Sequence, residues 1–301
     1  MLERTLPDSG AGLAGWWARH GFDDGSRTAR VYRELIARAG PASERHQTTV
    51  SVALDMRRAA KTIRAAGGGL KGAAETLAQE AHTLTAALRA AELNPARWWG
   101  PAELAFALRA AYDPAAAAGL ESNPALGRDL GAAGPVAVAE SWTGLRTDSA
   151  FHQVLWISQW PRALVFPGFL APLLLSSGIT RSFSLTVEPL RADQAARDLR
   201  KKKTEHLADR TQRARIGQVE DAARTAEYED VLKQEADLTQ GHGVVRYTGL
   251  VTVTAPSRPE LGKALAAVGQ AAVQAACETR VLAGQQAQAF TAAALPLARR
   301  V

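Results

Sequence analysis

Two stretches in the second half of the chain alternate apolar and polar residues, as half-buried β-strands do. Within Thr180–Glu188, Phe183, Leu185 and Val187 alternate with the polar residues Ser182, Ser184 and Thr186. Val245–Val253 alternates in the same way, whereas Arg191–Gln240, between the two, has almost no apolar stripe. Sequential strands are usually adjacent. We therefore predict that the two strands are neighbours in one sheet and that the intervening segment projects from its end.

The intervening segment divides into two halves of opposite charge. Residues 191–215 carry nine Lys/Arg and four Asp/Glu, and residues 218–240 carry two Lys/Arg and seven Asp/Glu. Gly217 lies between them, and a glycine costs about 1 kcal/mol in a helix interior relative to alanine, so a break is expected there. We predict an antiparallel helical hairpin with a basic and an acidic arm. The alternative, that Arg200–Lys203 binds nucleic acid, is disfavoured because the acidic arm would cancel the positive field.

The rest of the pattern mixes helices and strands. Helical periodicity predicts helices over Arg27–Ala39, Arg57–Ala66, Leu70–Leu93, Pro101–Tyr112, Pro259–Glu278 and Gly284–Ala294. Alternation predicts further strands over Thr49–Met56, Val136–Thr147 and Ala150–Trp160. The fold class expected from this order is α+β, with a largely antiparallel sheet packed with helices and the charged hairpin projecting at about 191–240. We predict a helix-rich N-terminal lobe with at least one strand at 1–133 and an α+β lobe at 134–301.

Composition narrows the class of protein without naming a function. The chain has 301 residues, 47% of them hydrophobic, enough for a sizeable core. Its formal net charge of +6 permits contact with anionic surfaces. Cys277 is the one cysteine, so no disulfide can form within the chain, and a reducing, cytoplasmic compartment is expected. The first residues lack the apolar core of a signal peptide.

The most apolar window is Ala163–Ile179. It is shorter than the roughly 20 residues that span a bilayer, and Pro167 and Pro172 interrupt it. We predict a buried turn followed by a short helix, with a membrane-surface contact as the alternative.

The search for catalytic or metal-binding motifs finds none that is complete. Gly67–Gly72 is glycine-rich but lacks the spacing and the hydroxyl of a phosphate-binding loop. The six histidines are scattered, whereas metal ligands usually come in close pairs on one element. Gly241-His242-Gly243 is best interpreted as a turn before a strand. We therefore predict no enzymatic activity, no metal and no cofactor, and keep a hydrolase with an unrecognised site as an alternative.

The order of segments from residue 163 onward resembles a known family. The segments are Phe169–Leu175 (Phe-Leu-Ala-Pro-Leu-Leu-Leu), Arg181–Pro189, a charged helical pair broken at Arg215-Ile-Gly217, Glu235–His242, Val251–Ala255 and the closing Ala294–Arg299 (Ala-Leu-Pro-Leu-Ala-Arg). This resembles the N-terminal, non-ATPase region of the VirB/TraC/TrbE-type ATPases of type IV secretion and conjugation. It is most similar to actinobacterial conjugation-associated proteins that lack the motor domain. The resemblance implies a region without catalytic residues, in a short member of the family or a fragment of a longer protein.

These observations predict a non-catalytic assembly component of a conjugative transfer or type IV secretion apparatus. It would act through protein–protein contacts, peripherally at the cytoplasmic face of the membrane. Its partners would be other subunits of the apparatus, a motor ATPase among them, with self-association and peripheral membrane contact as further options. A basic nucleic-acid-binding adaptor is the alternative. The residues expected to bind a partner are Phe169, Leu170, Arg200, Lys201, Lys202, Lys203 and Gly217.

Overall fold

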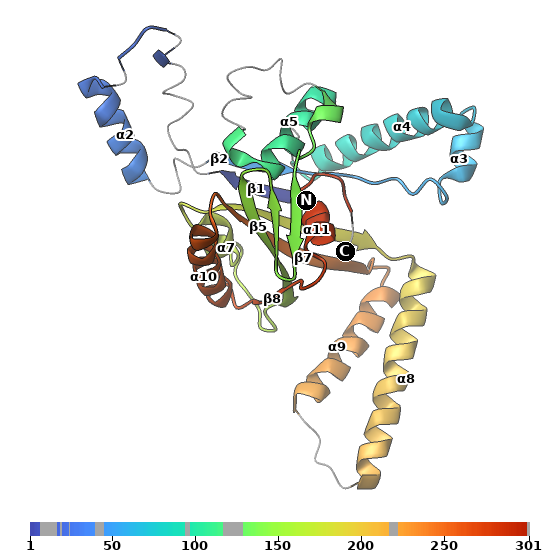
Figure 1. The fold of residues 1–301 in the computed structure, drawn as a ribbon. Helices are drawn as coiled ribbons and strands as arrows, with labels where there is room; N and C mark the ends of the chain where they lie inside the picture. The colour runs from blue at the N-terminus through green and yellow to red at the C-terminus, as the bar shows by residue number, and fades with distance from the viewer. Residues whose placement is uncertain are drawn as a thin grey trace. The chain divides into compact units, whose positions relative to one another are not determined.

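A computed structural model describes residues 1–6, 17–18, 20–23, 25–39, 45–93, 97–116, 129–216 and 222–299 (Figure 1). The chain forms two compact units. Unit 1 comprises Met1–Leu185 and Gly249–Val301, and unit 2 comprises Thr186–Thr248. Each is described by itself below. The predicted division of the chain into lobes at residues 133 and 134 stays a prediction.

The described residues form one eight-stranded sheet. The strands are β1 (Leu2–Leu6), β2 (Arg45–Thr49), β3 (Val138–Ser141), β4 (Gly144–Thr147), β5 (Ala150–Gln159), β6 (Thr180–Pro189), β7 (Val245–Ala255) and β8 (Glu278–Val281). Their order is β2-β1-β6-β7-β5-β4-β3, and β8 pairs with β5. Every strand pair whose register is described is antiparallel. The α+β class with a largely antiparallel sheet is therefore confirmed, and β6 and β7 are neighbours as predicted.

The described residues form helices, several of which begin and end close to their predicted bounds. They are α2 (Arg27–Ala39), α3 (Ala60–Ala65), α4 (Gly69–Ala90), α5 (Pro101–Tyr112), α7 (Ala171–Leu175), α8 (Ala192–Ile216), α9 (Ala222–Thr239), α10 (Arg258–Gln274) and α11 (Gln286–Ala293). Local signals explain two of the starts. Glu103 accepts a hydrogen bond from the Gly100 N–H, with Pro101 as the first helical residue of α5. Ser257 caps α10 by accepting from the Glu260 N–H.

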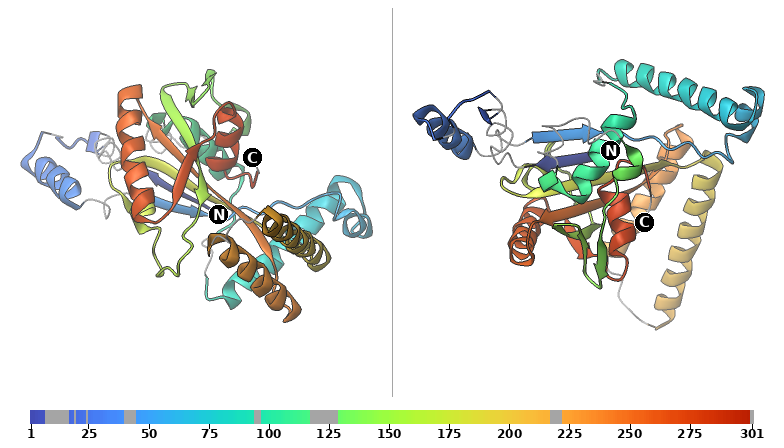
Figure 2. Two further views of the ribbon diagram at one scale, coloured as in Figure 1. Left: turned by 90° about the horizontal axis from the view of Figure 1, so that it is seen from below. Right: turned by 45° about the horizontal axis from the view of Figure 1, so that its top comes forward.

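Helices cover both faces of the sheet in unit 1 (Figures 1 and 2). Side chains alternate along β5, so Leu155 and Ile157 point to one face and Val154 to the other. The first face packs against α10 and α7, in a core that contains Leu173 and Val268. The second packs against α11 and the end of α5. Unit 1 is thus a sheet between two helical layers.

Burial on both faces changes the expectation for the strand at 180–188. Ser182 and Ser184 were expected on a solvated face, but both are buried, as is Phe183 between them. The Ser184 hydroxyl donates to the Ala292 carbonyl at the end of α11. The prediction of a half-buried strand is wrong at this part of β6, because α11 covers the face that was expected to be solvated. Since α11 begins more than 100 residues after Ser184, the local pattern of β6 does not reveal it.

The strand predicted over Thr49–Met56 is wrong. β2 ends at Thr49, and Val50, Val52 and Met56 are exposed. Alternation alone does not make a strand where no neighbouring strand accepts the backbone hydrogen bonds. The predicted strand at 136–147 is instead two strands, β3 and β4, which pair as a hairpin.

Three strands were not predicted from the sequence: β1, β8 and, apart from Thr49, β2. β1 is only five residues long and pairs with both β2 and β6. β8 begins at Glu278, which was expected to end a helix. The helix, α10, ends earlier because Ala276 adopts a φ of 52° and the Cys277 N–H donates a hydrogen bond to the Ala272 carbonyl. This combination is typical of helix C-termini.

Candidate interaction surfaces

The central polar group of unit 1 is His152, on β5. Its Nε2 lies 2.6 Å from Thr147 Oγ1, and its Nδ1 lies 2.9 Å from Thr254 Oγ1. The ring packs 4.6 Å from the ring of Phe290. Burial lowers the pKa of His152 to about 4, so the imidazole is neutral at physiological pH. With 0% of its surface exposed, it supports the fold and cannot reach a substrate.

A groove of about 420 Å³ opens on the α10 face of the sheet in unit 1. Its walls are the β3–β4 hairpin and the first half of α10. Phe151 lies in it, and the guanidinium carbons of Arg146 and Arg258 lie 5.3 and 5.7 Å from the centre of the Phe151 ring. Both distances fit cation–π contacts. We refer to this site as the arginine groove.

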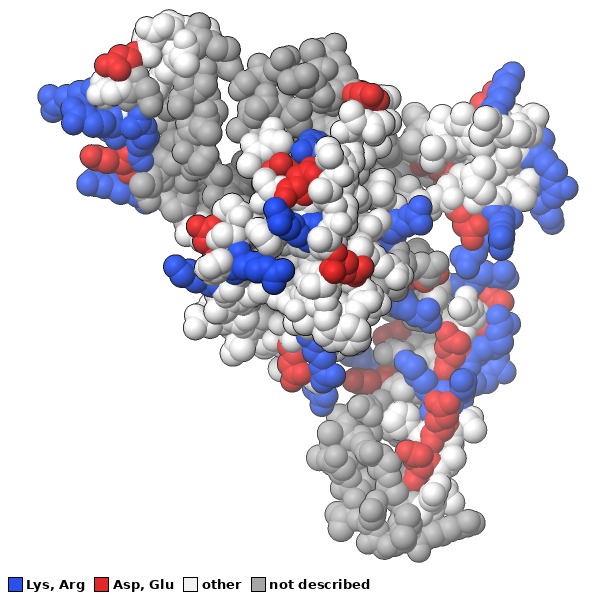
Figure 3. Space-filling view, viewed as in Figure 1, with Lys and Arg blue, Asp and Glu red and all other residues white. Residues whose placement is uncertain are grey.

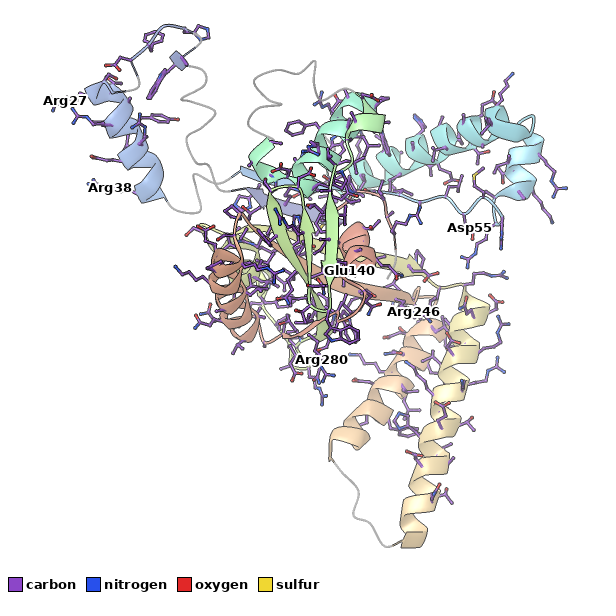
Figure 4. The ribbon with its side chains drawn as sticks, viewed as in Figure 1. Arg27, Arg38, Asp55, Glu140, Arg246 and Arg280 are labelled. Carbon is purple, nitrogen blue, oxygen red and sulfur yellow. The ribbon has the colours of Figure 1, made fainter. Side chains whose placement is uncertain are left out.

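The arginine groove is positively charged. Within the described part of the chain neither Arg146 nor Arg258 makes an ion pair. Glu140, which also lines the groove, accepts a hydrogen bond from the Ala287 N–H at the start of α11 (Figure 4 labels Glu140). The two guanidinium groups can therefore each donate hydrogen bonds to a carboxylate from outside unit 1.

The predicted partner residues Phe169 and Leu170 lie just before α7. Both are half-buried against the core that contains Leu173, in the predicted turn followed by a short helix. The most exposed large apolar side chains of this window come earlier, at Leu164 and Phe166. A partner role for Phe169 and Leu170 stays a prediction. No described helix is long and apolar enough to cross a membrane.

In unit 2, the basic and acidic arms pair as α8 and α9. Lys203 Nζ donates to Glu235 Oε2 at 2.7 Å, and the rings of His206 and Tyr228 lie 6.1 Å apart. The hydrogen bond to Glu235 raises the pKa of Lys203. The later residue of α8, His206, contacts the earlier residue of α9, Tyr228, so the two helices run antiparallel. The predicted antiparallel hairpin is therefore confirmed.

The four consecutive basic residues do not form one patch. Successive residues of an α-helix turn by about 100°, so four in a row surround the helix. Arg200 donates to the Ala196 carbonyl, Lys201 lies 3.9 Å from Glu205, and Lys203 faces α9. Figure 3 shows basic and acidic side chains mixed along α8. This arrangement gives no support to the nucleic-acid alternative.

Lys201 and Lys202 line a second groove, of about 650 Å³, at the base of the hairpin. Acidic and basic groups both line it, and Arg246 lies 3.8 Å from Asp198 there. The Gly241-His242-Gly243 turn closes α9, as predicted, with Gly241 at φ 90. Gly217, the remaining predicted partner residue, lies outside the described residues.

Neither a metal cluster nor a reactive thiol emerges from the described residues. No group of three or more His, Cys, Asp or Glu among them is placed to hold a metal ion. Cys277 is buried, and burial raises the pKa of its thiol. Trp98, which the sequence places beside a second tryptophan, donates its indole N–H to Thr85 on α4.

Comparison with known families gives a match to part of the chain. Residues 42–157 match the EccE family, described as "Putative type VII ESX secretion system translocon, EccE". The matched span runs from before β2 through most of β5 and includes Arg146 and Phe151. No curated protein matches the chain.

The match bears on the predicted role in two ways. It supports the prediction that this chain is a component of a secretion system. The matched family is associated with a translocon and hence with a membrane. The match does not support the type IV assignment, because the matched family belongs to a type VII system. The resemblance to VirB/TraC/TrbE proteins rests on residues 163–300, which lie outside the matched span.

Proposed function

We propose that this chain is a non-catalytic subunit of an ESX-like type VII secretion translocon. It acts through protein–protein contacts, next to the membrane on its cytoplasmic side. The observation that carries the proposal is the EccE match over residues 42–157. That span forms the helices α3 to α5, the strands β2, β3 and β4, and nearly all of β5.

The arginine groove is the part of unit 1 best suited to a neighbouring subunit. It presents two guanidinium groups beside an aromatic ring, a combination favoured in protein interfaces. A partner segment that brings carboxylates would form charge-assisted, bidentate hydrogen bonds with Arg146 and Arg258. Other translocon subunits, including a motor ATPase, and a second copy of this chain are the candidate partners.

The chemistry of the buried polar residues supports a structural role. His152 lies between two threonine hydroxyls, and the Thr147 hydroxyl donates to the Tyr112 carbonyl. These groups satisfy one another and hold α5, β4, β5 and β7 together in unit 1. They leave no acid, base and nucleophile facing a common space.

Purification of the assembled translocon from its own host tests the proposal. A tagged chain would be expressed at its native level, and membranes would be solubilised and resolved by native electrophoresis. We expect the chain to migrate with the other secretion subunits, and its deletion to stop export of the system's secreted proteins. Migration only as free protein, with export intact in the deletion strain, would contradict the proposal.

Matched charge reversals test the arginine groove separately. R146E/R258E should remove the chain from the assembly while leaving its thermal unfolding unchanged. K71E/R89E changes the charge by the same amount at two exposed residues of α4 and serves as the control. Equal incorporation of both double variants would exclude the groove as the docking site.

A further inference from the structure

The loop between β5 and α7 exposes three consecutive large apolar side chains. Leu164 is 103% exposed, as open as in an extended peptide, and Phe166 is 86% exposed. Val165 between them is exposed as well. Soluble proteins rarely leave several large apolar side chains together in water. We call residues 163–167 the apolar loop.

A second apolar group lies at the same end of the sheet. α10 starts beside Phe151, near the beginning of β5, and the chain returns to β5 at Glu278, which pairs with Gln159 at its end. The last turn of α10 therefore lies at the end of β5 where the apolar loop begins. Val273, in that turn, is 76% exposed.

Basic side chains flank this apolar end. Arg162 precedes the loop and is exposed. Arg280, on β8, pairs with Trp156 on β5 and is also exposed (Figure 4). Glu278 is the acidic residue beside them, so the three charges sum to +1. Segments that bind at a membrane surface place apolar side chains at the boundary between headgroups and acyl chains, and their Lys and Arg side chains are attracted to anionic lipids.

We infer that the apolar loop inserts Leu164 and Phe166 into the interfacial layer of an anionic lipid bilayer. The inference deepens the proposed function, on which its membrane-adjacent location rests. The loop is a projecting tip, and a fluid bilayer receives such a tip without a complementary cavity. Arg162 and Arg280 would lie at the level of the lipid phosphates, where cations are attracted.

A fluorescent probe on the loop tests this directly. Cys277 is buried, so a maleimide dye at neutral pH labels a cysteine introduced by L164C. An environment-sensitive dye there should shift to the blue and brighten at least twofold with vesicles of equal phosphatidylglycerol and phosphatidylcholine. The same dye at V136C is the control. Val136 is 94% exposed and lies by the start of β5, about 30 Å from the loop at 3.3 Å per residue.

Variants provide the second measurement. L164S/F166S should lose at least fivefold in vesicle flotation, and V136S should not. Equal flotation of L164S/F166S and the unchanged chain, or a silent dye at residue 164, would overturn the inference. A dye shielded only when another secretion subunit is added would also overturn it, in favour of a protein partner.

The vesicle experiment needs no other subunit, so its outcome is independent of the proposed function. Loop insertion without incorporation into a translocon would reject the proposed function and keep the inference. Incorporation with a silent dye would do the reverse.

Discussion

His152 Nδ1 lies 2.9 Å from Thr254 Oγ1, across 102 residues of sequence. The two residues face each other on the paired strands β5 and β7. The other ring nitrogen meets Thr147 Oγ1, whose hydroxyl donates to the Tyr112 carbonyl. The Nε2–H must therefore be the donor to Thr147, and Nδ1 accepts from Thr254. This neutral imidazole joins the middle of the sheet to the end of α5.

Acid should destabilise the protein through His152. The folded pKa is about 4 and the ordinary value is 6.5. Between these values the unfolded chain binds a proton that the folded chain excludes, so stability falls as pH drops from 6.5 to 4. The shift corresponds to about 3 kcal/mol of unfolding free energy. Urea unfolding at pH 7.5 and pH 4 should show this loss.

A variant isolates the His152 contribution from that of other groups. H152N should be less stable than the unchanged chain at pH 7.5 but lose about 3 kcal/mol less on acidification. H82N changes an exposed histidine of α4 and should leave the pH dependence as it is. Parallel pH profiles for H152N and the unchanged chain would show that His152 is not the responsible group.

The buried Arg4 should be needed for the packing of unit 1. Its Nη1 donates to the Ala107 carbonyl at 3.0 Å, and its Nη2 donates to the Ala294 carbonyl at 2.7 Å. Burial lowers its pKa to about 10, which still leaves it charged at neutral pH. R4M would leave both carbonyls without this hydrogen-bond donor and should lower the free energy of unfolding by about 2–4 kcal/mol. R30M, at an exposed residue of α2, should change stability by less than about 0.5 kcal/mol.

Gly249 should tolerate no side chain. A Cβ there would lie 2.6 Å from Trp160 Cζ2 and 3.0 Å from Ile157 Cδ1. G249A should lower the free energy of unfolding by about 1–3 kcal/mol, because the two side chains must leave their packed positions. Gly269 on α10 has open space at the same distance, so G269A should raise stability by about 0.5–1 kcal/mol. Thermal unfolding of the two variants should shift in opposite directions.

The hairpin of unit 2 should depend on the pairing of Lys203 with Glu235. K203E places two carboxylates 32 residues apart in sequence against each other, and should speed amide hydrogen exchange in α8 and α9. The double variant K203E/E235K should restore slow exchange, since it restores opposite charges. K201E, which breaks a contact within α8 alone, is the control. Raising the salt concentration should shrink the difference between K203E and the unchanged chain.

The sequence alone determined the kind of element at many places and the general class of the fold. Arg27–Ala39 and Pro101–Tyr112 are helices with the predicted ends, because their periodicity and their stops are local. The hairpin could be predicted because the basic arm before residue 217 and the acidic arm after it are each recognisable from local sequence. The alternation at 180–188 and 245–253 likewise identified two adjacent strands.

Tertiary structure decided which faces are buried and which residues form surfaces. Ser184 is buried because α11, from the far end of the chain, covers it, and β1 is a strand because β6 lies beside it. The arginine groove brings Arg146 together with Arg258, 112 positions later, over one phenyl ring. Leu164 and Leu173 belong to one apolar window, yet the first is exposed and the second is core. The local sequence pattern indicates whether a residue favours water and whether a segment favours a helix. Whether a residue is buried depends on which distant segments pack against it.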